Sequence, residues 1–244
     1  MGTHTGLHWR AGSTIFSLCR CRTGATRRFS PLQGGYHDAV TFNDDALVRV
    51  GELLRDIAAG KAGFAQLPLD QRGAAKAAYD RLVKLILRSQ VLSRGQLSIW
   101  AQQYDMLALT PAGARNFEPA SLATGESGGV LAFLMDDPAP TPVMRRAIES
   151  GVTWLRAHAL ADVVWTKPDG EAAKRLVAAP GAEPLWPRYV DIASGRALFG
   201  DRDRTIHDTV TDLSPERRSG YAWYVTTPGK TLKAYECWRR AKAK

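Results

Sequence analysis

The sequence predicts one mostly α-helical domain that carries short, irregular β-strands in its last third. The chain has 244 residues, of which 45% are hydrophobic, and this is enough for one sizeable core. Apolar residues recur at helical spacing before Ala159, and this period is lost after it. We therefore expect antiparallel helix pairs followed by a weakly β part.

Four segments carry the helical pattern. The first begins near Asn43, which is a suitable N-cap because two acidic residues follow it in the first turn. The fourth begins with Thr141 as N-cap and Pro142 at the first helical position. The two helices between them are expected at residues 71–90 and 121–135.

After these helices the chain reads as short extended runs separated by turns. Strands are expected at residues 163–165, 186–191 and 197–199, because Pro- and Gly-containing turns separate these runs. The run ERRSGYAWY follows at residues 216–224, and the sequence then predicts only a basic C-terminus.

Residues 1–30 differ from the rest of the chain. They are rich in Ser and Thr, contain no acid and hold five arginines: Arg10, Arg20, Arg22, Arg27 and Arg28. This is the composition of an organellar transit peptide, and it lacks the apolar run of a secretory signal. We interpret residues 1–30 as an atypical, disordered or non-native segment in front of a catalytic domain at residues 31–244.

The charge of the chain narrows the class of partner. The formal net charge of +9 falls to +4 without those five arginines. A mildly basic body suits an acidic polysaccharide, and the absence of lysine blocks or a repeated basic–aromatic pattern argues against nucleic acid. No apolar run reaches membrane-spanning length. Three cysteines without a CxxC pair indicate neither a disulfide framework nor a zinc site.

Two candidate sites contain carboxylates. Asp44 and Asp45 at a helix start either cap that helix or bind calcium, which needs oxygen ligands from several places. Arg115 and Glu118 lie in a loop that leads into an apolar helix. They form either a surface ion pair or part of a binding or catalytic site.

Two further candidates are rich in arginine. Arg202 lies in the run Asp-Arg-Asp-Arg at residues 201–204, which is either a solvated turn or part of a site. Arg217 and Arg218 precede an aromatic run and either bind carboxylates bidentately or line a solvated edge. The sequence contains no HExxH, GxGxxG or phosphate-binding loop.

Four segments in a fixed order resemble a known family. They are GGYHDAVTFNDDALVRVGELLRDI, ARNFEPASLATGESGGVLAFLM, PLWPRYVDIASGRALFGDRDR and ERRSGYAWY. Together they resemble the catalytic domain of the family 10 pectate lyases. The resemblance runs from about Pro31 to Trp238, roughly 85% of the chain.

The resemblance implies a fold and a reaction. The fold is an (α/α) toroid of paired antiparallel helices, here incomplete. The reaction is calcium-dependent β-elimination of α-1,4-polygalacturonate, which gives 4,5-unsaturated oligogalacturonides. By motif position the residues are Arg115 as base, Asp44 (or Asp45) as ligand of Ca2+, and Arg202 with one of Arg217 and Arg218 as contacts to substrate carboxylates. Neighbouring cations and partial desolvation are expected to lower the cost of a neutral arginine.

The sequence also departs from the family. Such domains begin earlier, with a helix pair and an Asp-Asn motif that serves the active site, and nothing before Pro31 resembles that region. We therefore expect an open toroid and weak or absent turnover. The alternative is a non-catalytic protein that binds pectin or another acidic polysaccharide. The family implies a secreted or periplasmic monomer, although the chain shows no export signal.

Overall fold

The computed structural model describes residues 34–242, of which 46% are helical and 17% form strands. The atypical segment expected at residues 1–30 lies outside the described residues. The α-helices are α2 (Ala46–Ala59), α3 (Leu69–Ser89), α4 (Thr124–Met135), α5 (Pro142–Ala157), α6 (Pro215–Ser219) and α7 (Thr227–Lys242). The 3-10 helices are η1 (Gly35–Asp38), η2 (Asn43–Asp45), η3 (Ala62–Phe64) and η4 (Val210–Asp212).

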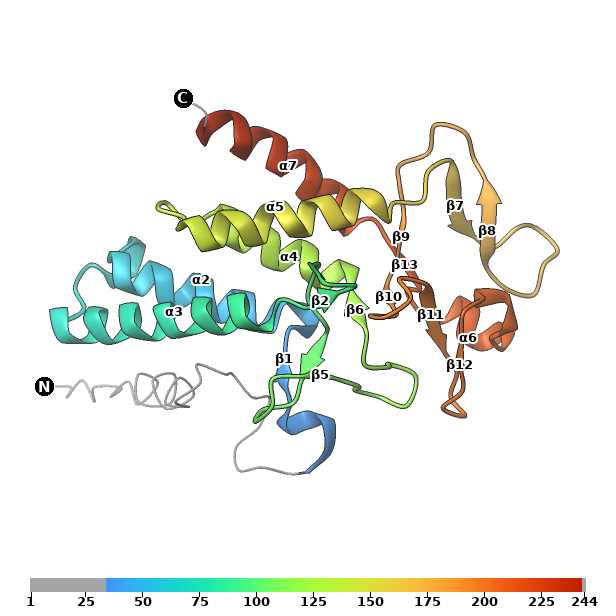
Figure 1. Ribbon diagram of the computed structural model, residues 1–244, viewed down its shortest axis with the longest axis horizontal. Helices are drawn as coiled ribbons and strands as arrows, with labels where there is room; N and C mark the ends of the chain where they lie inside the picture. Colours follow the sequence, from blue (N-terminus) through green and yellow to red (C-terminus); the bar gives the residue numbers. More distant parts are fainter. Residues whose placement is uncertain (1–33, 243–244) are drawn as a thin grey trace, which may run out of the picture.

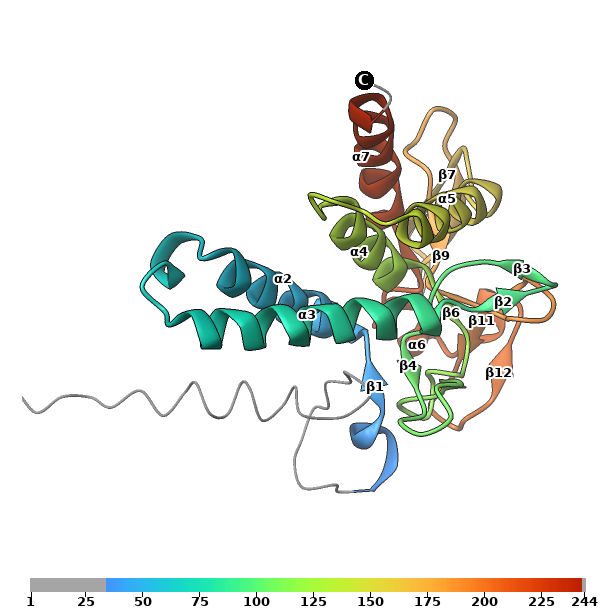
Figure 2. The same cartoon turned by 60° about the vertical axis from the view of Figure 1, so that its left-hand side comes forward.

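The helices pack in two groups (Figure 1). The long helices α2 and α3 form an antiparallel pair, and their apolar faces supply much of the main core. The second group contains α4, α5 and α7, which contact one another, and α4 also contacts α2. Figure 2 shows the α2–α3 pair extending to one side of the molecule while the small strands lie on the other.

Helix α4 is the centre of the helical part. Nine of its twelve residues are buried, including Leu131 and Phe133, because its sequence is apolar or small on nearly every face. Thr231 of α7 donates a hydrogen bond to the backbone oxygen of Gly128, 3.1 Å away, so the two helices approach closely where α4 has small residues. A helix with this composition is buried between neighbours on several sides.

The expected (α/α) toroid is therefore wrong. A toroid places consecutive antiparallel helix pairs around one axis, each helix with one apolar face inward. Here α4 does not turn one apolar face toward a common axis, because it is enclosed by α2, α5 and α7. The chain between α5 and α7 forms small separate sheets instead of further helix pairs.

The strands are short and all antiparallel. They are β1 (Val40–Thr41), β2 (Leu92–Ser93), β3 (Gln96–Leu97), β4 (Gln103–Tyr104), β5 (Pro111–Ala112), β6 (Leu122–Ala123), β7 (Val163–Thr166), β8 (Arg175–Ala178), β9 (Trp186–Pro187), β10 (Tyr189–Val190), β11 (Ala197–Gly200), β12 (Ile206–His207) and β13 (Tyr224–Val225). The sheets have the orders β1-β4-β5, β12-β11-β10-β6, β13-β9, β2-β3 and β7-β8.

Two of these sheets position the loops of the site. In the four-stranded sheet Tyr189 of β10 pairs with Ala123 of β6 and Leu198 of β11, which fixes the entry of the chain into α4. In the three-stranded sheet β4 lies between β1, which leads into η2, and β5, which leads into the loop that carries Arg115. A second, smaller core lies around the four-stranded sheet and includes Trp223.

Within residues 34–242, no helix has the length and apolar character that crossing a membrane requires.

Candidate active site

The predicted base and the predicted calcium ligand meet at one small polar cavity. Asp44 comes from η2, and Arg115 comes from the loop between β5 and β6. The cavity has a volume of about 140 Å³ and is lined by Tyr36, Asn43, Asp44, Gln102, Gln103, Ala114, Arg115 and Glu118. Asp44 and Arg115 are distant in the sequence, and the β1–β4–β5 sheet brings them together.

The wall formed by η2 is strained. Asp44 and Asp45 both have left-handed backbones, with φ of 54° and 57°. This conformation is unfavourable for residues with a Cβ, and such strain is typical of functional sites. Asn43 does not cap α2 with its side chain, so the expected N-cap is wrong. Its Nδ2 instead donates to Oδ2 of Asp44 at 2.6 Å, while its Oδ1 accepts from Gln102 at 2.9 Å.

The two aspartates have different surroundings. Asp44 lines the cavity, whereas Asp45 packs against α4 at Gly129. A Cβ added to Gly129 would lie 2.3 Å from Oδ1 of Asp45, so only glycine lets this carboxylate lie there. Of the two aspartates, Asp44 is therefore the one that lines the cavity.

Arg115 and Glu118 form a partly buried pair. The side chain of Glu118 is 1% exposed and that of Arg115 is 49% exposed. Arg115 donates from Nη2 to Oε1 at 2.7 Å and from Nε to Oε2 at 3.0 Å, and its backbone N–H donates to Oε2 at 3.2 Å. Because one partner is fully buried, the pair is not the surface ion pair that the sequence left open.

The pair shifts both pKa values. The hydrogen bond to Glu118 raises the pKa of the Arg115 guanidinium, and this outweighs the lowering by partial burial. Burial alone would raise the pKa of Glu118, but hydrogen bonds from Arg115 and Tyr221 outweigh it and lower the pKa. The surroundings therefore act on Arg115 in the direction opposite to the one expected from the sequence.

A chain of buried hydroxyl and amide groups connects the two walls of the cavity. Tyr221 donates to Oε1 of Glu118 at 2.7 Å, and its oxygen lies 2.8 Å from the hydroxyl of Tyr189. Tyr189 donates to Oε1 of Gln102 at 2.5 Å, and Gln102 donates to Asn43. Burial raises the pKa of Tyr221 to about 12, so the hydroxyl keeps its proton. The sequence did not identify either tyrosine.

The three predicted arginine positions gather around one ring, that of Phe117. The guanidinium carbons of Arg217, Arg115 and Arg202 lie 3.6, 5.2 and 6.0 Å from the centre of this ring. Phe117 also meets the ring of Tyr221 edge to face, with centroids 5.6 Å apart. The sequence did not identify Phe117, because its contacts with Arg202 and Arg217 join segments that are distant in the chain.

Arg217 and Arg218 differ in their surroundings. Arg217 is 3% exposed and lies over the rings of Phe117, Tyr221 and Trp223. Desolvation lowers its pKa, and within the described chain its Nε and Nη2 find no hydrogen-bond acceptor. Arg218 is half-buried and has no such ring contact in residues 34–242. Of these two arginines, Arg217 is the one that belongs to the cluster around Phe117.

Arg202 is an exposed residue in a well-fixed loop. Its guanidinium donates to Glu216 from both Nε and Nη2 at 2.9 Å. Asp201 fastens this loop to the start of α6, because it accepts from Ser214 N at 2.7 Å and Ser214 Oγ at 3.1 Å. The loop is thereby held beside α6, the helix that carries Arg217.

A second ion pair lies beneath η2. Arg188, between β9 and β10, donates to Oε1 of the buried Glu126 at 2.6 Å, and the same Nη2 lies 3.5 Å from Oδ1 of Asn43. Its guanidinium also lies 5.4 Å from the ring centre of Tyr221. The sequence identified neither Arg188 nor Glu126, because an apolar helix gave no reason to expect a buried acid.

The donor set fits calcium only when a ligand contributes to it. Within residues 34–242, no three His, Cys, Asp or Glu side chains gather into a metal cage. The cavity offers the carboxylate of Asp44 and, in its wall, the buried Oε1 of Gln103, which has no hydrogen-bond partner. Calcium takes six to eight oxygens. These residues therefore fit a calcium ion whose shell is completed by a carboxylate ligand and water.

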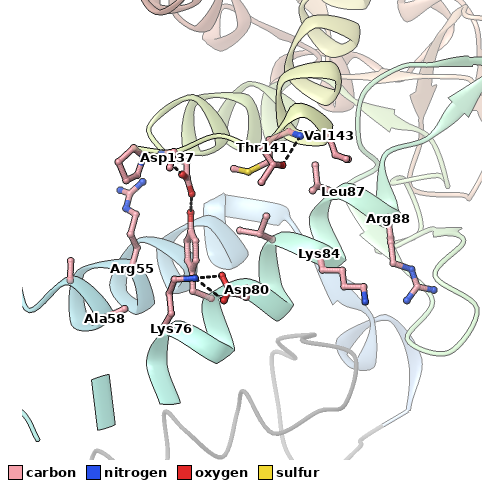
Figure 3. A pocket seen from close by; sticks show the side chains of 16 residues that line it. Arg55, Ala58, Lys76, Asp80, Lys84, Leu87, Arg88, Asp137, Thr141 and Val143 are labelled. Atoms are coloured by element: carbon pink, nitrogen blue, oxygen red, sulfur yellow. Dashed lines mark hydrogen bonds and ion pairs between the residues drawn. The ribbon is translucent and has the colours of Figure 1, made fainter. Parts of the chain in front are cut away.

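A larger groove lies elsewhere, between α3 and the start of α5 (Figure 3). Its volume is about 960 Å³, and Tyr79 bridges it by donating to Asp137 at 2.5 Å. Val83, Leu87 and Met144 contribute an apolar surface, and none of the predicted site residues lines the groove. Four basic side chains, Arg55, Lys76, Lys84 and Arg88, also line this groove, but it lacks every predicted site residue, so the cavity at Asp44 and Arg115 remains the candidate active site.

The site combines a carboxylate, a half-exposed arginine and an arginine cluster, a set that binds carboxylate groups of a ligand. Two solved structures share the fold: a Family 10 polysaccharide lyase from Cellvibrio cellulosa, and a mutant of it in complex with trigalacturonic acid. Each is 31% identical with a TM-score of 0.85, and the match covers 93% of this chain and 70% and 71% of those chains. The class is thus that of the polysaccharide lyases.

The family model described as pectic acid lyase matches residues 13–232. The chain belongs to this pectic acid lyase family, and the resemblance noted in the sequence is confirmed. No curated protein matches the chain.

Proposed function

We propose that this lyase cleaves polygalacturonate by β-elimination, with Arg115 as the base and with calcium bound at Asp44. The observation that carries the proposal is that Asp44 and Arg115 line one cavity, beside the arginine cluster around Phe117. The trigalacturonic acid bound by the mutant relative supports a galacturonate substrate. Such a polymer occurs outside the cell, so we infer that the enzyme acts there.

The reaction needs a base and a cationic surrounding. The neutral guanidine of Arg115 takes the proton from C5 of the uronate. The electron pair of the C5–H bond forms the C4–C5 double bond, the bond from C4 to the glycosidic O4 breaks, and the leaving oxygen takes a proton from water. Negative charge builds up beside the uronate carboxylate, so cations there stabilise the transition state.

The charged residues have separate roles in this proposal. Calcium, when bound, supplies positive charge beside the uronate carboxylate, and Asp44 would hold it; Asp45 is the second choice because it packs against α4. Arg202 exchanges its exposed partner Glu216 for a substrate carboxylate. Arg217 holds the ring of Phe117 in place and adds charge from beneath, while Arg218 contacts substrate only from the edge of the cluster.

The base sets the pH dependence. Arg115 must lose a proton before it can accept one, and this is costly at neutral pH because the ordinary pKa of arginine lies far above neutrality. Glu118 raises the pKa of Arg115, so the neutral fraction is small at neutral pH and grows as the pH rises. We expect the rate to increase from neutral to alkaline pH, and a bell-shaped profile with its maximum near pH 6 would contradict Arg115 as the base.

The test is an assay for unsaturated product. Wild type and Arg115→Ala are compared on polygalacturonate, with calcium and with a chelator, by the rise in absorbance of the new double bond. Because a general base contributes roughly 10²–10⁴-fold, the variant is expected to lose activity by that factor. Arg175→Ala is the control, since Arg175 forms an exposed ion pair with Glu171. Equal rates for wild type and Arg115→Ala would exclude Arg115. The same assay tests the expectation of weak turnover.

A second candidate function is binding of acidic polysaccharide without cleavage. The raised pKa of Arg115 favours it, because a guanidinium held by a buried carboxylate binds carboxylates well and deprotonates with difficulty. Calcium-dependent retention on polygalacturonate, with no unsaturated product at any pH up to about 10, would establish this function over catalysis.

A further inference from the structure

Glu118 is held from two directions. Its side chain is 1% exposed, and its two oxygens accept four hydrogen bonds: from N, Nε and Nη2 of Arg115 and from the hydroxyl of Tyr221. Charge-assisted bonds of this kind are short and directional, and a buried network that is fully satisfied is rigid. The position of the carboxylate is therefore fixed.

A fixed Glu118 also fixes the orientation of the guanidinium. The carboxylate takes the edge formed by Nε and Nη2, so Nη1 lies on the side of the guanidinium away from Glu118. The side chain of Arg115 remains 49% exposed and lines the cavity with Asp44. The free part of the guanidinium is thus the part that a ligand in the cavity meets.

Tyr221 is itself held firmly. Its hydroxyl lies 2.8 Å from that of Tyr189, which donates to Gln102 at 2.5 Å. Its ring lies 4.7 Å from that of Trp223 and 5.6 Å from that of Phe117, centroid to centroid. Since these contacts come from different segments of the chain, the hydroxyl of Tyr221 has little freedom to move away from Glu118.

We propose that Glu118, clamped by Tyr221, is the positioning residue that aims Nη1 of Arg115 into the cavity. This rests on the proposed function, in which Arg115 is the base. Glu118 has the same physical task as the carboxylate of a catalytic triad, which orients the base and stabilises the cation that proton transfer creates. The neutral guanidine gains a proton at Nη1, and the resulting guanidinium is paired with Glu118.

Kinetics separate this role from a structural one. Glu118→Gln keeps the size of the side chain but loses the charge, and Tyr221→Phe keeps the ring but loses the clamp. Because misplacing a catalytic group by about 1 Å costs roughly 100-fold, both variants are expected to lose kcat by about that factor while KM changes little. The controls are Glu171→Gln, from an exposed pair with Arg175, and Tyr235→Phe on α7. Unchanged kcat in folded Glu118→Gln would overturn the proposal.

A spectroscopic measurement tests the positioning without turnover. The Nε–H of Arg115 is observed by ¹⁵N NMR and assigned from its loss in Arg115→Lys. We expect slow hydrogen exchange in wild type and at least about tenfold faster exchange in both variants, because Glu118→Gln loses the charged acceptor of the Nε–H and Tyr221→Phe loses the hydroxyl that holds Glu118. Unchanged exchange in both variants would overturn the positioning role. If wild type forms no product, the proposed function fails, and the NMR result still decides whether Glu118 and Tyr221 hold Arg115.

Discussion

The ring of Phe117 is the common contact of three arginine side chains in the site. An aromatic ring attracts a nearby guanidinium through its negative face, by about 0.5–2 kcal/mol for each contact. Like charges would otherwise separate Arg115, Arg202 and Arg217, so the ring offsets part of their mutual repulsion. The cluster can therefore present a dense positive charge to a polyanion.

Replacing this ring should weaken substrate binding. Phe117→Leu keeps an apolar side chain of similar size but removes the aromatic face, so the arginines lose their shared support. We expect KM for polygalacturonate to rise roughly tenfold, which corresponds to about 1.4 kcal/mol. Phe64→Leu on η3, at the turn between α2 and α3, is the matched control and should leave KM unchanged. A normal KM in Phe117→Leu would show that the ring does not support binding.

The family motifs predicted some of these site residues, but they could not predict residues that act through contacts between distant segments. Asp44, Arg115 and Arg202 follow from the resemblance, and the structure places the first two in one cavity. Phe117 and Tyr189 act through contacts with segments that are distant in sequence, and no local pattern reveals such contacts. The burial of Glu118 was equally invisible, because a charged residue in a polar loop is usually exposed.

Gly200, at the end of β11, lets this strand approach the loop that carries Arg115. A Cβ at this position would lie 2.4 Å from the backbone oxygen of Phe117, and a backbone atom cannot rotate out of the way. The loop and the strand must therefore separate when glycine is replaced. This close contact lies directly between the strand that leads to Arg202 and the loop that carries Arg115.

We expect Gly200→Ala to lower both stability and activity. Overpacking of this kind costs about 1–3 kcal/mol, and the displaced loop moves Arg115 relative to Asp44. The measurements are urea unfolding and the rate on polygalacturonate. Gly73→Ala is the control, because Gly73 lies within α3 with no atom near its Cβ position, and that change should stabilise the helix by roughly 1 kcal/mol. If both variants behave alike, the close approach at Gly200 has no role.

The sequence predicted individual elements better than their ends and arrangement. Thr141 caps α5 as expected, since its Oγ1 accepts from Met144 N at 3.2 Å. The expected helix at 121–135 starts at Thr124 because Leu122–Ala123 pairs with β10 as a strand. Helix α7 was missed, because its charged residues obscure the apolar face that buries Tyr235.

At the scale of the whole molecule, the site joins two cores. The main core includes residues of the helices and Val40 of β1, the strand that leads into η2. Trp223 and Tyr189 belong to the smaller core. The hydrogen bonds from Glu118 through Tyr221 and Tyr189 to Gln102 cross between them. The toroid was a wrong expectation that came from the family resemblance, and the helical periodicity could not correct it, because periodicity shows which residues are buried but not which helices they face.

We expect the free energy of unfolding to decrease at acidic pH, because several carboxyl groups have a lowered pKa in the folded protein. The folded pKa of Glu118 lies below its ordinary value of 4.5, and hydrogen bonds also hold the pKa values of Asp191 and Asp201 below 3.8. An acid with a lowered folded pKa stabilises the folded state above its unfolded pKa. This contribution is lost as the pH falls through the lowered value.

The variant Glu118→Gln measures how much of this pH-dependent stability comes from Glu118. Gln resembles a protonated Glu, so the variant should be less stable than wild type at pH 7, by about 1–3 kcal/mol for hydrogen bonds to a charged group. The difference should shrink as the pH falls from about 5 to 3, because wild type then loses the same charge. Urea unfolding at pH 7, 5, 4 and 3 measures both curves, with Glu171→Gln as the exposed control. A gap that stays constant over this range would mean that Glu118 contributes by packing, whereas a closing gap identifies its charge as what binds the Arg115 loop to the smaller core.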